Sequence, residues 1–184
     1  MEQITLTTPL SDHDVEKLRS GQRIFLNGII YTARDAAHKR LIELIEQGKE
    51  LPFNLKGQAI YYVGPTPARP GAVIGAAGPT TSYRMDPYTP KLYELGLKAT
   101  IGKGARAESV IKALKKYKGI YFAAVGGAAA LISKCIKACR VIAYPELGAE
   151  AIHELMVENF PVIVVNDIHG GDLYKEGIMK YASK

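Results

Sequence analysis

Two patterns of apolar and polar positions follow one another along the chain, and the change falls at Pro87. In the first part, short apolar runs are separated by glycine, proline and polar turns, which predicts a strand-rich, irregular region. The strands predicted there cover residues 4–8, 23–32, 59–63 and 73–77. One helix is predicted to start after Ser11 and to end at Gly21, and a second to cover residues 36–45, where apolar residues recur at helical spacing. An Asn-Gly pair at 27–28 predicts a turn or bulge inside the second strand.

From Pro87 onward, helical patterns alternate regularly with short apolar strands. The helices are predicted over 90–95, 107–117, 128–138 and 149–158, and the strands over 99–101, 120–125, 140–144 and 161–165. This alternation is typical of a parallel sheet with helices on both faces, so we expect an α/β fold with a mixed, largely parallel sheet in the C-terminal half. The length of 184 residues suits one well-buried domain, and we predict that residues 1–184 form a single domain.

Composition narrows the classes of protein that the chain can represent. Hydrophobic residues make up 47% and charged residues 23% of the chain, an ordinary balance for a soluble protein. No apolar stretch reaches the length of a membrane span, and the first residues lack a signal-peptide pattern, so we expect a cytoplasmic protein. The net charge of +6 permits nucleic-acid binding, but no RNA-binding or zinc-finger signature accompanies it. A basic cleft for a small anion fits the charge equally well.

The cysteines and histidines give no metal-binding pattern. Cys135 and Cys139 lie four residues apart in a predicted helix, and two thiolates are too few to hold an iron–sulfur cluster. We interpret both as buried structural thiols. The remaining candidates, His13, His153 and His169, are scattered along the chain and lack the spacing of a zinc site.

Three cationic side chains are predicted to lie where strands or loops end. Arg34 follows a strand and precedes a helix, with Asp35 in the first helical turn, so it provides either an anion site or a surface ion pair. Arg84 lies in the loop over 78–86 and can bind a carboxylate through two hydrogen bonds. Lys103 stands between two glycines at the end of a strand, where the backbone can approach a ligand closely.

The loop Gly78-Pro79-Thr80-Thr81-Ser82-Tyr83-Arg84-Met85-Asp86 also carries three hydroxyl groups. A threonine such as Thr80 acts as a base only when a strong base or charged surroundings deprotonate it. Asp86 either orients Arg84 or caps the helix that follows, and we favour the capping role. Together these groups suit a small substrate with two carboxylates, yet the sequence contains no evident acid–base pair and no cofactor motif.

Three segments resemble, in the right order, the hallmark segments of the class I (iron–sulfur) fumarate hydratase family. They are Ala-Arg-Asp-Ala-Ala-His at 33–38, the loop over 78–86, and Ile-Gly-Lys-Gly at 101–104. The segment over 164–174 is similar to the closing segment of that family, so the resemblance covers nearly the whole chain. It is a resemblance to the C-terminal domain, which two-subunit members of the family carry as a separate beta subunit.

The resemblance implies a swivelling β/β/α fold and an alpha subunit whose three cysteines hold a [4Fe–4S] cluster, with an open iron that acts as a Lewis acid. This chain alone would then bind no metal or cofactor. The resemblance further implies that Arg34, Arg84 and Lys103 bind the substrate carboxylates and that Thr80 is the catalytic base. The supporting residues are expected to be Asp35, Thr81 and Asp86.

The expected reaction is the reversible hydration of fumarate to L-malate, carried out together with the alpha subunit in an assembly of two alpha and two beta chains. L-Tartrate dehydratase shares these motifs, so a beta subunit that helps to convert tartrate to oxaloacetate is an alternative. A non-catalytic module that binds anions or nucleic acid is a further alternative, which only the charge suggests. We expect no nucleic-acid or membrane partner.

Overall fold

The computed structural model describes residues 3–182. Within this range the strands are β1 (Ile4–Thr7), β2 (Arg23–Thr32), β3 (Ala59–Tyr61), β4 (Ala99–Gly102), β5 (Ile120–Ala123), β6 (Ile136–Ala143) and β7 (Ile152–Asn166). The α-helices are α1 (Asp12–Glu16), α2 (Asp35–Glu46), α3 (Thr89–Glu94), α4 (Glu108–Lys116), α5 (Ala129–Ile132) and α6 (Leu173–Tyr181). Short 3₁₀ helices are η1 (Ser82–Met85), η2 (Ser133–Cys135) and η3 (Pro145–Glu150). None of these helices is long and apolar enough to cross a membrane.

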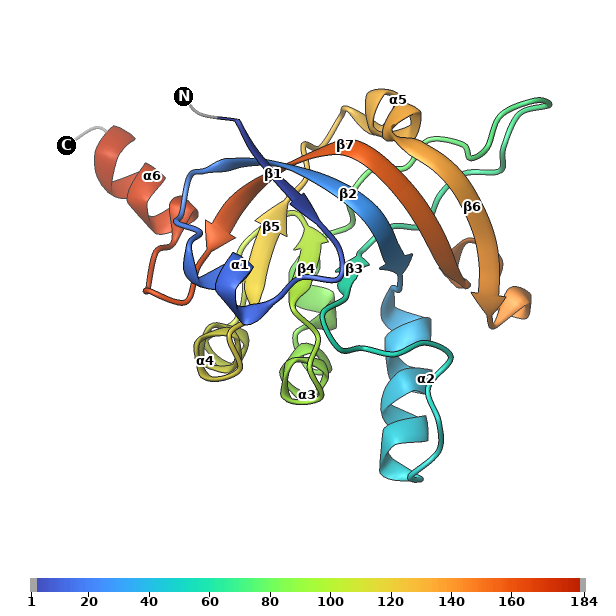
Figure 1. Cartoon of the computed structure of the whole chain (residues 1–184), viewed down its shortest axis with the longest axis horizontal. Coiled ribbons are helices and arrows are strands. Elements are labelled where there is room, and N and C mark those ends of the chain that lie inside the picture. Colours follow the sequence, from blue (N-terminus) through green and yellow to red (C-terminus); the bar gives the residue numbers. More distant parts are fainter. Residues whose placement is uncertain (1–2, 183–184) are drawn as a thin grey trace.

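The strands form one sheet in the order β1-β2-β3-β4-β5-β7-β6, in which β2 and β7 also pair with each other. Neighbours from β1 to β5 are parallel, whereas β7 runs antiparallel to β2, β5 and β6. Because β7 bridges β5 and β2, the strands β2, β3, β4, β5 and β7 close into a ring. Figure 1 shows the long strands β2, β7 and β6 curving together over the short parallel strands β3 to β5.

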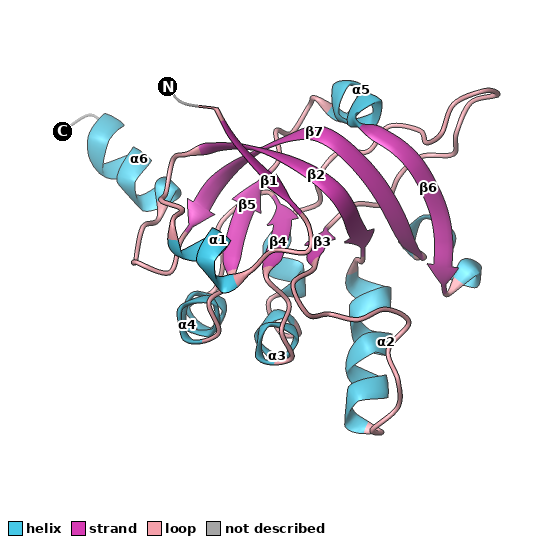
Figure 2. Cartoon of the chain, in the orientation of Figure 1, coloured by secondary structure: helices cyan, strands magenta, loops and turns pink. Residues whose placement is uncertain are grey.

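Apolar residues on the two faces of the short parallel strands pack into two separate cores. Tyr61 of β3 points into the inner core between the strands, where its ring meets that of Phe160 edge-on at 5.2 Å. Its neighbours Ile60 and Tyr62 point the other way and pack against the helices. Helices α2, α3 and α4 lie together on that outer side (Figure 2). Burial on both faces explains why β3 is apolar without alternation, and the predicted α/β class is confirmed.

Two local predictions in the first part of the chain are confirmed in detail. Ser11 caps α1 through a reciprocal pair of contacts, since its Oγ accepts from the backbone of Asp14 and the Asp14 carboxylate accepts from the backbone of Ser11. The helix is shorter than predicted, however, and ends at Glu16. The expected bulge in β2 occurs where the pairing with β7 shifts between Leu26 and Gly28, and Gly28 has a φ of +96°.

Three predicted elements are wrong, and all lie outside the parallel part of the sheet. Residues 73–77 form a loop and not a strand. The predicted helix over 128–138 is helical only to residue 135 and then becomes β6, so Cys135 and Cys139 do not share a helix face. The predicted helix over 149–158 is instead the first half of β7. Long-range pairing with β2 and β6 overrides the helix propensity of its Glu, Leu and Met residues, and the C-terminal half is therefore mixed but not largely parallel.

Candidate active site

The loops that follow the parallel strands leave the sheet at one edge, because parallel strands have their carboxyl ends side by side. The loop over 78–86 returns to this edge, where the backbone N–H of Thr80 donates to the carbonyl oxygen of Tyr62 at 2.7 Å. Ligands of parallel sheets, both open and closed, bind at the carboxyl ends of the strands, which makes this edge the candidate site. The segments that follow β2, β3, β4 and β5 there contain, in turn, Arg34, Gly64, Lys103 and Gly126, each within three residues of the strand end.

Thr80, Thr81 and Lys103 are brought together where this loop meets the end of β4. The backbone N–H of Lys103 donates to Thr80 O at 3.2 Å, and Ser82 N donates to Lys103 O at 2.9 Å. Thr81 and Lys103 thereby form an isolated parallel bridge. Within residues 3–182, Thr80 Oγ1 and Lys103 Nζ form no hydrogen bond or ion pair, so the structure leaves both groups open to a ligand.

Each of the two glycines beside Lys103 is required for a different structural reason. A Cβ at Gly102 would collide with Ser82 Oγ, which packs directly against the glycine backbone. Gly104 has a φ of +82°, a conformation that L side chains rarely adopt. The Gly-Lys-Gly sequence thus allows the loop over 78–86 to lie against the end of β4 while the lysine side chain stays exposed.

Arg34, Asp35 and Arg84 form a second cluster, which also includes Glu150. Asp35 Oδ1 accepts a hydrogen bond from Arg84 Nε at 2.9 Å, and Arg84 Nη2 forms an ion pair with Asp35 Oδ2 at 2.8 Å. Arg34 Nη2 lies 3.2 Å from Glu150 Oε1. The four formal charges cancel. Arg84 uses one of its five N–H groups in a hydrogen bond to Asp35, and its side chain is 41% exposed. It therefore retains donors for a carboxylate of a ligand.

Asp86 does not orient Arg84, the role that the sequence left open for it. It is buried and pairs with Arg106, whose Nε lies 2.7 Å from its Oδ1, while its Oδ2 accepts from the backbone N–H of Ala107 just before α4. The expected capping contact thus falls on α4 and not on the helix that follows next in the chain. Asp35 takes the orienting position beside Arg84.

Arg106 is a structural partner of the site that sequence reasoning missed. Its side chain is 0% exposed, and besides Asp86 it donates to Thr100 Oγ1 at 2.9 Å and to Thr89 Oγ1 at 3.0 Å. Its guanidinium also lies over the ring of Tyr121, 4.7 Å from the ring centroid. These contacts join β4, β5 and α3 beneath the loop over 78–86. A lone arginine before a helix carries no pattern that could have announced this role.

His38 lies buried in the second turn of α2, directly beneath the candidate site. Burial lowers the pKa of His38 to about 4, so the ring is neutral at neutral pH. Its Nδ1 lies 2.9 Å from the carbonyl oxygen of Arg34 and donates to it, while Nε2 has no hydrogen-bond partner within the described residues. His38 therefore helps to fix the backbone of Arg34 at the start of the helix.

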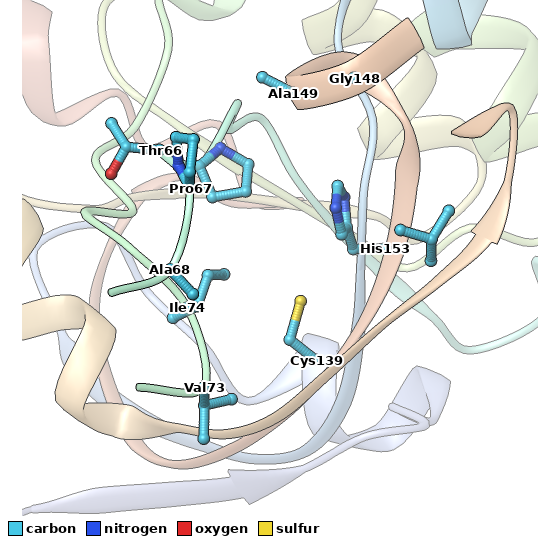
Figure 3. A pocket seen from close by; sticks show the side chains of 11 residues that line it. Thr66, Pro67, Ala68, Val73, Ile74, Cys139, Gly148, Ala149 and His153 are labelled. Atoms are coloured by element: carbon cyan, nitrogen blue, oxygen red, sulfur yellow. The ribbon is translucent and has the colours of Figure 1, made fainter. Parts of the chain in front are cut away.

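A separate cavity of about 380 Å³ opens beside the candidate site. Figure 3 shows Cys139 and His153 facing the loop that carries Thr66 and Ile74 across this cavity. None of the predicted site residues lines it. Burial raises the pKa of the Cys139 thiol and lowers the pKa of His153, so both groups are uncharged at neutral pH.

The described residues do not form a site for an iron–sulfur cluster. Within residues 3–182, no group of three or more His, Cys, Asp or Glu side chains is placed to hold a metal ion. Cys135 and Cys139 lie on η2 and β6, and two thiolates do not complete a cluster.

The chain is an α/β protein that presents a free ammonium group, a partly free guanidinium group and, within the described residues, an unpaired hydroxyl at the carboxyl ends of parallel strands, an arrangement with the donors that a small anion requires. Comparison with known sequences identifies the family. A family model described as "Fumarase C-terminus" matches residues 1–177, and the chain therefore belongs to this family.

Relatives of two kinds match the chain. The chain is 41% identical over 159 residues to "Fumarate hydratase 2" of Leishmania major and 41% identical over 160 residues to "Fumarate hydratase class I, anaerobic" of Escherichia coli K12, which covers 85% and 86% of this chain. It spans only 28% and 29% of those two proteins. It is 40% identical to the "Putative L(+)-tartrate dehydratase subunit beta" of Methanocaldococcus jannaschii, over 91% of this chain and 89% of that protein.

Proposed function

We propose that this chain is the beta part of an iron–sulfur hydro-lyase that interconverts fumarate and L-malate together with a cluster-bearing alpha partner. The observation that carries the proposal is the family match over residues 1–177, joined to the placement of Thr80, Lys103 and Arg84 at one sheet edge. The partner is supported by the length relation, because the chain corresponds to under a third of the fumarate hydratases named above and to most of a protein named as a beta subunit.

The cations of the site would bind the two carboxylates of the substrate. Asp35 and Glu150 offset the charges of Arg34 and Arg84. Among these three cations of the site, Lys103 is therefore the one that has no ion-pair partner within the described residues. Arg84 would add directional hydrogen bonds through its remaining N–H groups. A four-carbon diacid held in this way would have each carboxylate at a defined place.

Thr80 would move the proton at carbon. Hydration adds a hydroxyl group to one alkene carbon and a proton to the other, and in the reverse direction Thr80 Oγ would remove that proton as the base. Its hydroxyl has no competing hydrogen bond within the described residues, and its backbone is fixed by Tyr62 and Lys103. The cluster, which this chain has too few thiolates to hold, would supply a Lewis acid from the partner. We further propose that the domain swivels over the substrate in an assembly of two alpha and two beta chains.

The test is reconstitution of the chain with its cluster-bearing partner under anaerobic conditions, followed by assays with fumarate, L-malate and L-tartrate. We expect fumarate hydration by the pair and none by this chain alone. An assembled pair with an intact cluster that converts none of the three compounds would refute the proposal.

The roles of two residues can be separated in the same assay. Thr80→Val should lower turnover at least about 100-fold with assembly and cluster intact, since acid–base catalysis of this kind contributes about 10²–10⁴-fold. The matched control is Thr5→Val, the same change on the exposed side of β1, which should leave turnover unchanged. Arg84→Met should mainly weaken diacid binding, by about 2–5 kcal/mol. Normal turnover by the Thr80 variant would remove it as the base.

A tartrate dehydratase beta subunit is the second candidate. It is favoured by the match to the Methanocaldococcus jannaschii protein, which extends over 89% of that protein's length. The two candidates differ in the preferred substrate of the reconstituted pair, so a higher kcat/KM for L-tartrate than for L-malate would favour the second.

A further inference from the structure

Two tyrosine hydroxyls hold the peptide groups of Gly104, the residue directly after Lys103. The backbone N–H of Gly104 donates to the hydroxyl oxygen of Tyr174 at 2.9 Å, and the hydroxyl of Tyr121 donates to the carbonyl oxygen of Gly104 at 2.7 Å. Tyr174 comes from α6 and Tyr121 from β5, two elements far apart in the chain (Figure 1). The backbone after Lys103 is therefore held at both its donor and its acceptor.

The directions of these hydrogen bonds follow from counting hydrogens. Tyr121 has a single hydroxyl hydrogen, which goes to Gly104 O, so the contact of 2.9 Å between Tyr121 Oη and Ser82 Oγ must have Ser82 as the donor. Burial raises the pKa of Tyr121, and its hydroxyl remains protonated throughout the neutral range. Ser82, Tyr121 and Gly104 thus form a directed chain that joins the loop over 78–86 to the end of β4.

The backbone of Lys103 is fixed on its other side as well, by its own N–H to Thr80 O and by Ser82 N to Lys103 O. Only the lysine side chain is left free. We propose that Tyr121 and Tyr174 are positioning residues, whose hydroxyls fix the Lys103 loop so that the ammonium group meets a carboxylate of the dicarboxylate substrate. This inference rests on the proposed function for the identity of the ligand, while the clamp itself is a property of this chain.

Tyr174→Phe is the sharper of the two tests. Tyr174 is 37% exposed, and the hydrogen bond from Gly104 is the only one that its hydroxyl makes within the described residues. The substitution therefore removes the hydroxyl with little change in packing. The helix keeps its own N-cap, because the Asp172 side chain accepts from the backbone of Lys175. Tyr181→Phe is the matched control, since it makes the same change on an exposed residue of the same helix.

The first measurement is hydrogen–deuterium exchange of the Gly104 amide in this chain without a partner. Loss of one hydrogen bond should accelerate exchange by about threefold to tenfold in Tyr174→Phe and leave it unchanged in Tyr181→Phe. Unchanged exchange in Tyr174→Phe would overturn the clamp whatever the chain's function.

The second measurement uses the reconstituted enzyme. A misplaced Lys103 loses binding in the ground state and the transition state alike, so KM for the diacid should rise about threefold to tenfold with kcat nearly unchanged, and the affinity for succinate, an unreactive diacid, should fall equally. A purely structural effect would lower the active fraction and hence kcat, with KM and succinate affinity unchanged, and would overturn the positioning role. If exchange accelerates but the assembled pair converts no diacid, the proposed function fails, and with it the ligand named here.

Discussion

The buried ion pair between Arg106 and Asp86 gives the most demanding test of how the candidate site is supported. Arg106→Met would remove the guanidinium from a fully buried position and leave the carboxylate of Asp86 with one hydrogen bond, from the backbone of Ala107. The hydroxyls of Thr100 and Thr89 would lose a charged donor at the same time. Breaking a buried pair in this way costs about 3–5 kcal/mol, because a charge is left without compensation away from water.

In a chain of this size about 1 kcal/mol corresponds to roughly 2–4 °C in Tm, so Arg106→Met should lower Tm by about 6–20 °C. Urea unfolding of the chain, followed by circular dichroism, would measure the free energy directly. The matched control is Arg140→Met, which breaks an arginine–carboxylate pair with Glu154 that has two hydrogen bonds, at a side chain that is 72% exposed. That change should cost about 1 kcal/mol or less.

A double variant separates charge from packing. Asp86→Asn combined with Arg106→Met keeps an oxygen for the N–H of Ala107 but removes the unpaired charge, so it should be about 1–3 kcal/mol more stable than Arg106→Met alone. If Arg106→Met were as mild as Arg140→Met, or if the double variant gained nothing, the pair would not support the site in the way argued here.

Three further predictions concern single positions. The pKa of His38, about 4 in the folded chain, lies below its ordinary value of 6.5, so the unfolded chain takes up the proton first and stability falls as the pH drops from 6.5 to 4. Between pH 7 and pH 5 this should cost about 2 kcal/mol, so urea titrations at both pH values should show a loss of stability that is about 2 kcal/mol larger in the wild type than in His38→Phe. Gly102→Ala places a methyl group against Ser82 Oγ and should destabilise by about 1–3 kcal/mol, whereas Gly177→Ala, in α6 with open space around it, should stabilise by up to about 1 kcal/mol, both measured by urea unfolding. Lys103→Ala should change stability by less than about 0.5 kcal/mol while lowering the affinity of the assembled enzyme for succinate in calorimetry.

Those parts of the fold that depend on local signals could be predicted from the sequence. The cap of α1, the bulge in β2 and the strands β4 and β5 all follow from patterns within a few residues. The helix predicted over 149–158 failed because this segment pairs with a strand that is remote in the sequence. Glu154 of β7 pairs with Tyr31 of β2, 123 residues away, and such pairing is invisible to a window that reads periodicity along the chain.

The candidate site likewise contains residues that the sequence could predict and residues that it could not. Thr80 and Lys103 could be named as candidates from their motifs, and the fold brings their two loops together although they lie apart in the sequence. The residues that hold Thr80 and Lys103 in place could not be predicted from the sequence. Tyr174 and Arg106 belong to segments with no chemical signature, and only the folded chain brings them against the site. The sequence left Asp86, a near neighbour, as one possible orienting partner of Arg84, whereas the partner in the fold is Asp35, 49 residues away at the start of α2.

The loop over 78–86 can present chemistry and still be rigid because η1 divides its residues between two directions. Ser82, Met85 and Asp86 are buried and bind or pack against the scaffold, whereas Tyr83 and Arg84 are exposed. A 3₁₀ helix returns to the same face every three residues, which places Ser82 and Met85 together on the inner face. Substitutions at Tyr83, which is 64% exposed, can therefore alter contacts with a ligand or partner without disturbing the buried supports. Differences in substrate between related enzymes are accordingly expected at the position of Tyr83 and not at that of Ser82, and exchanging Tyr83 alone should shift the ratio of kcat/KM for L-malate and L-tartrate with no change in urea stability.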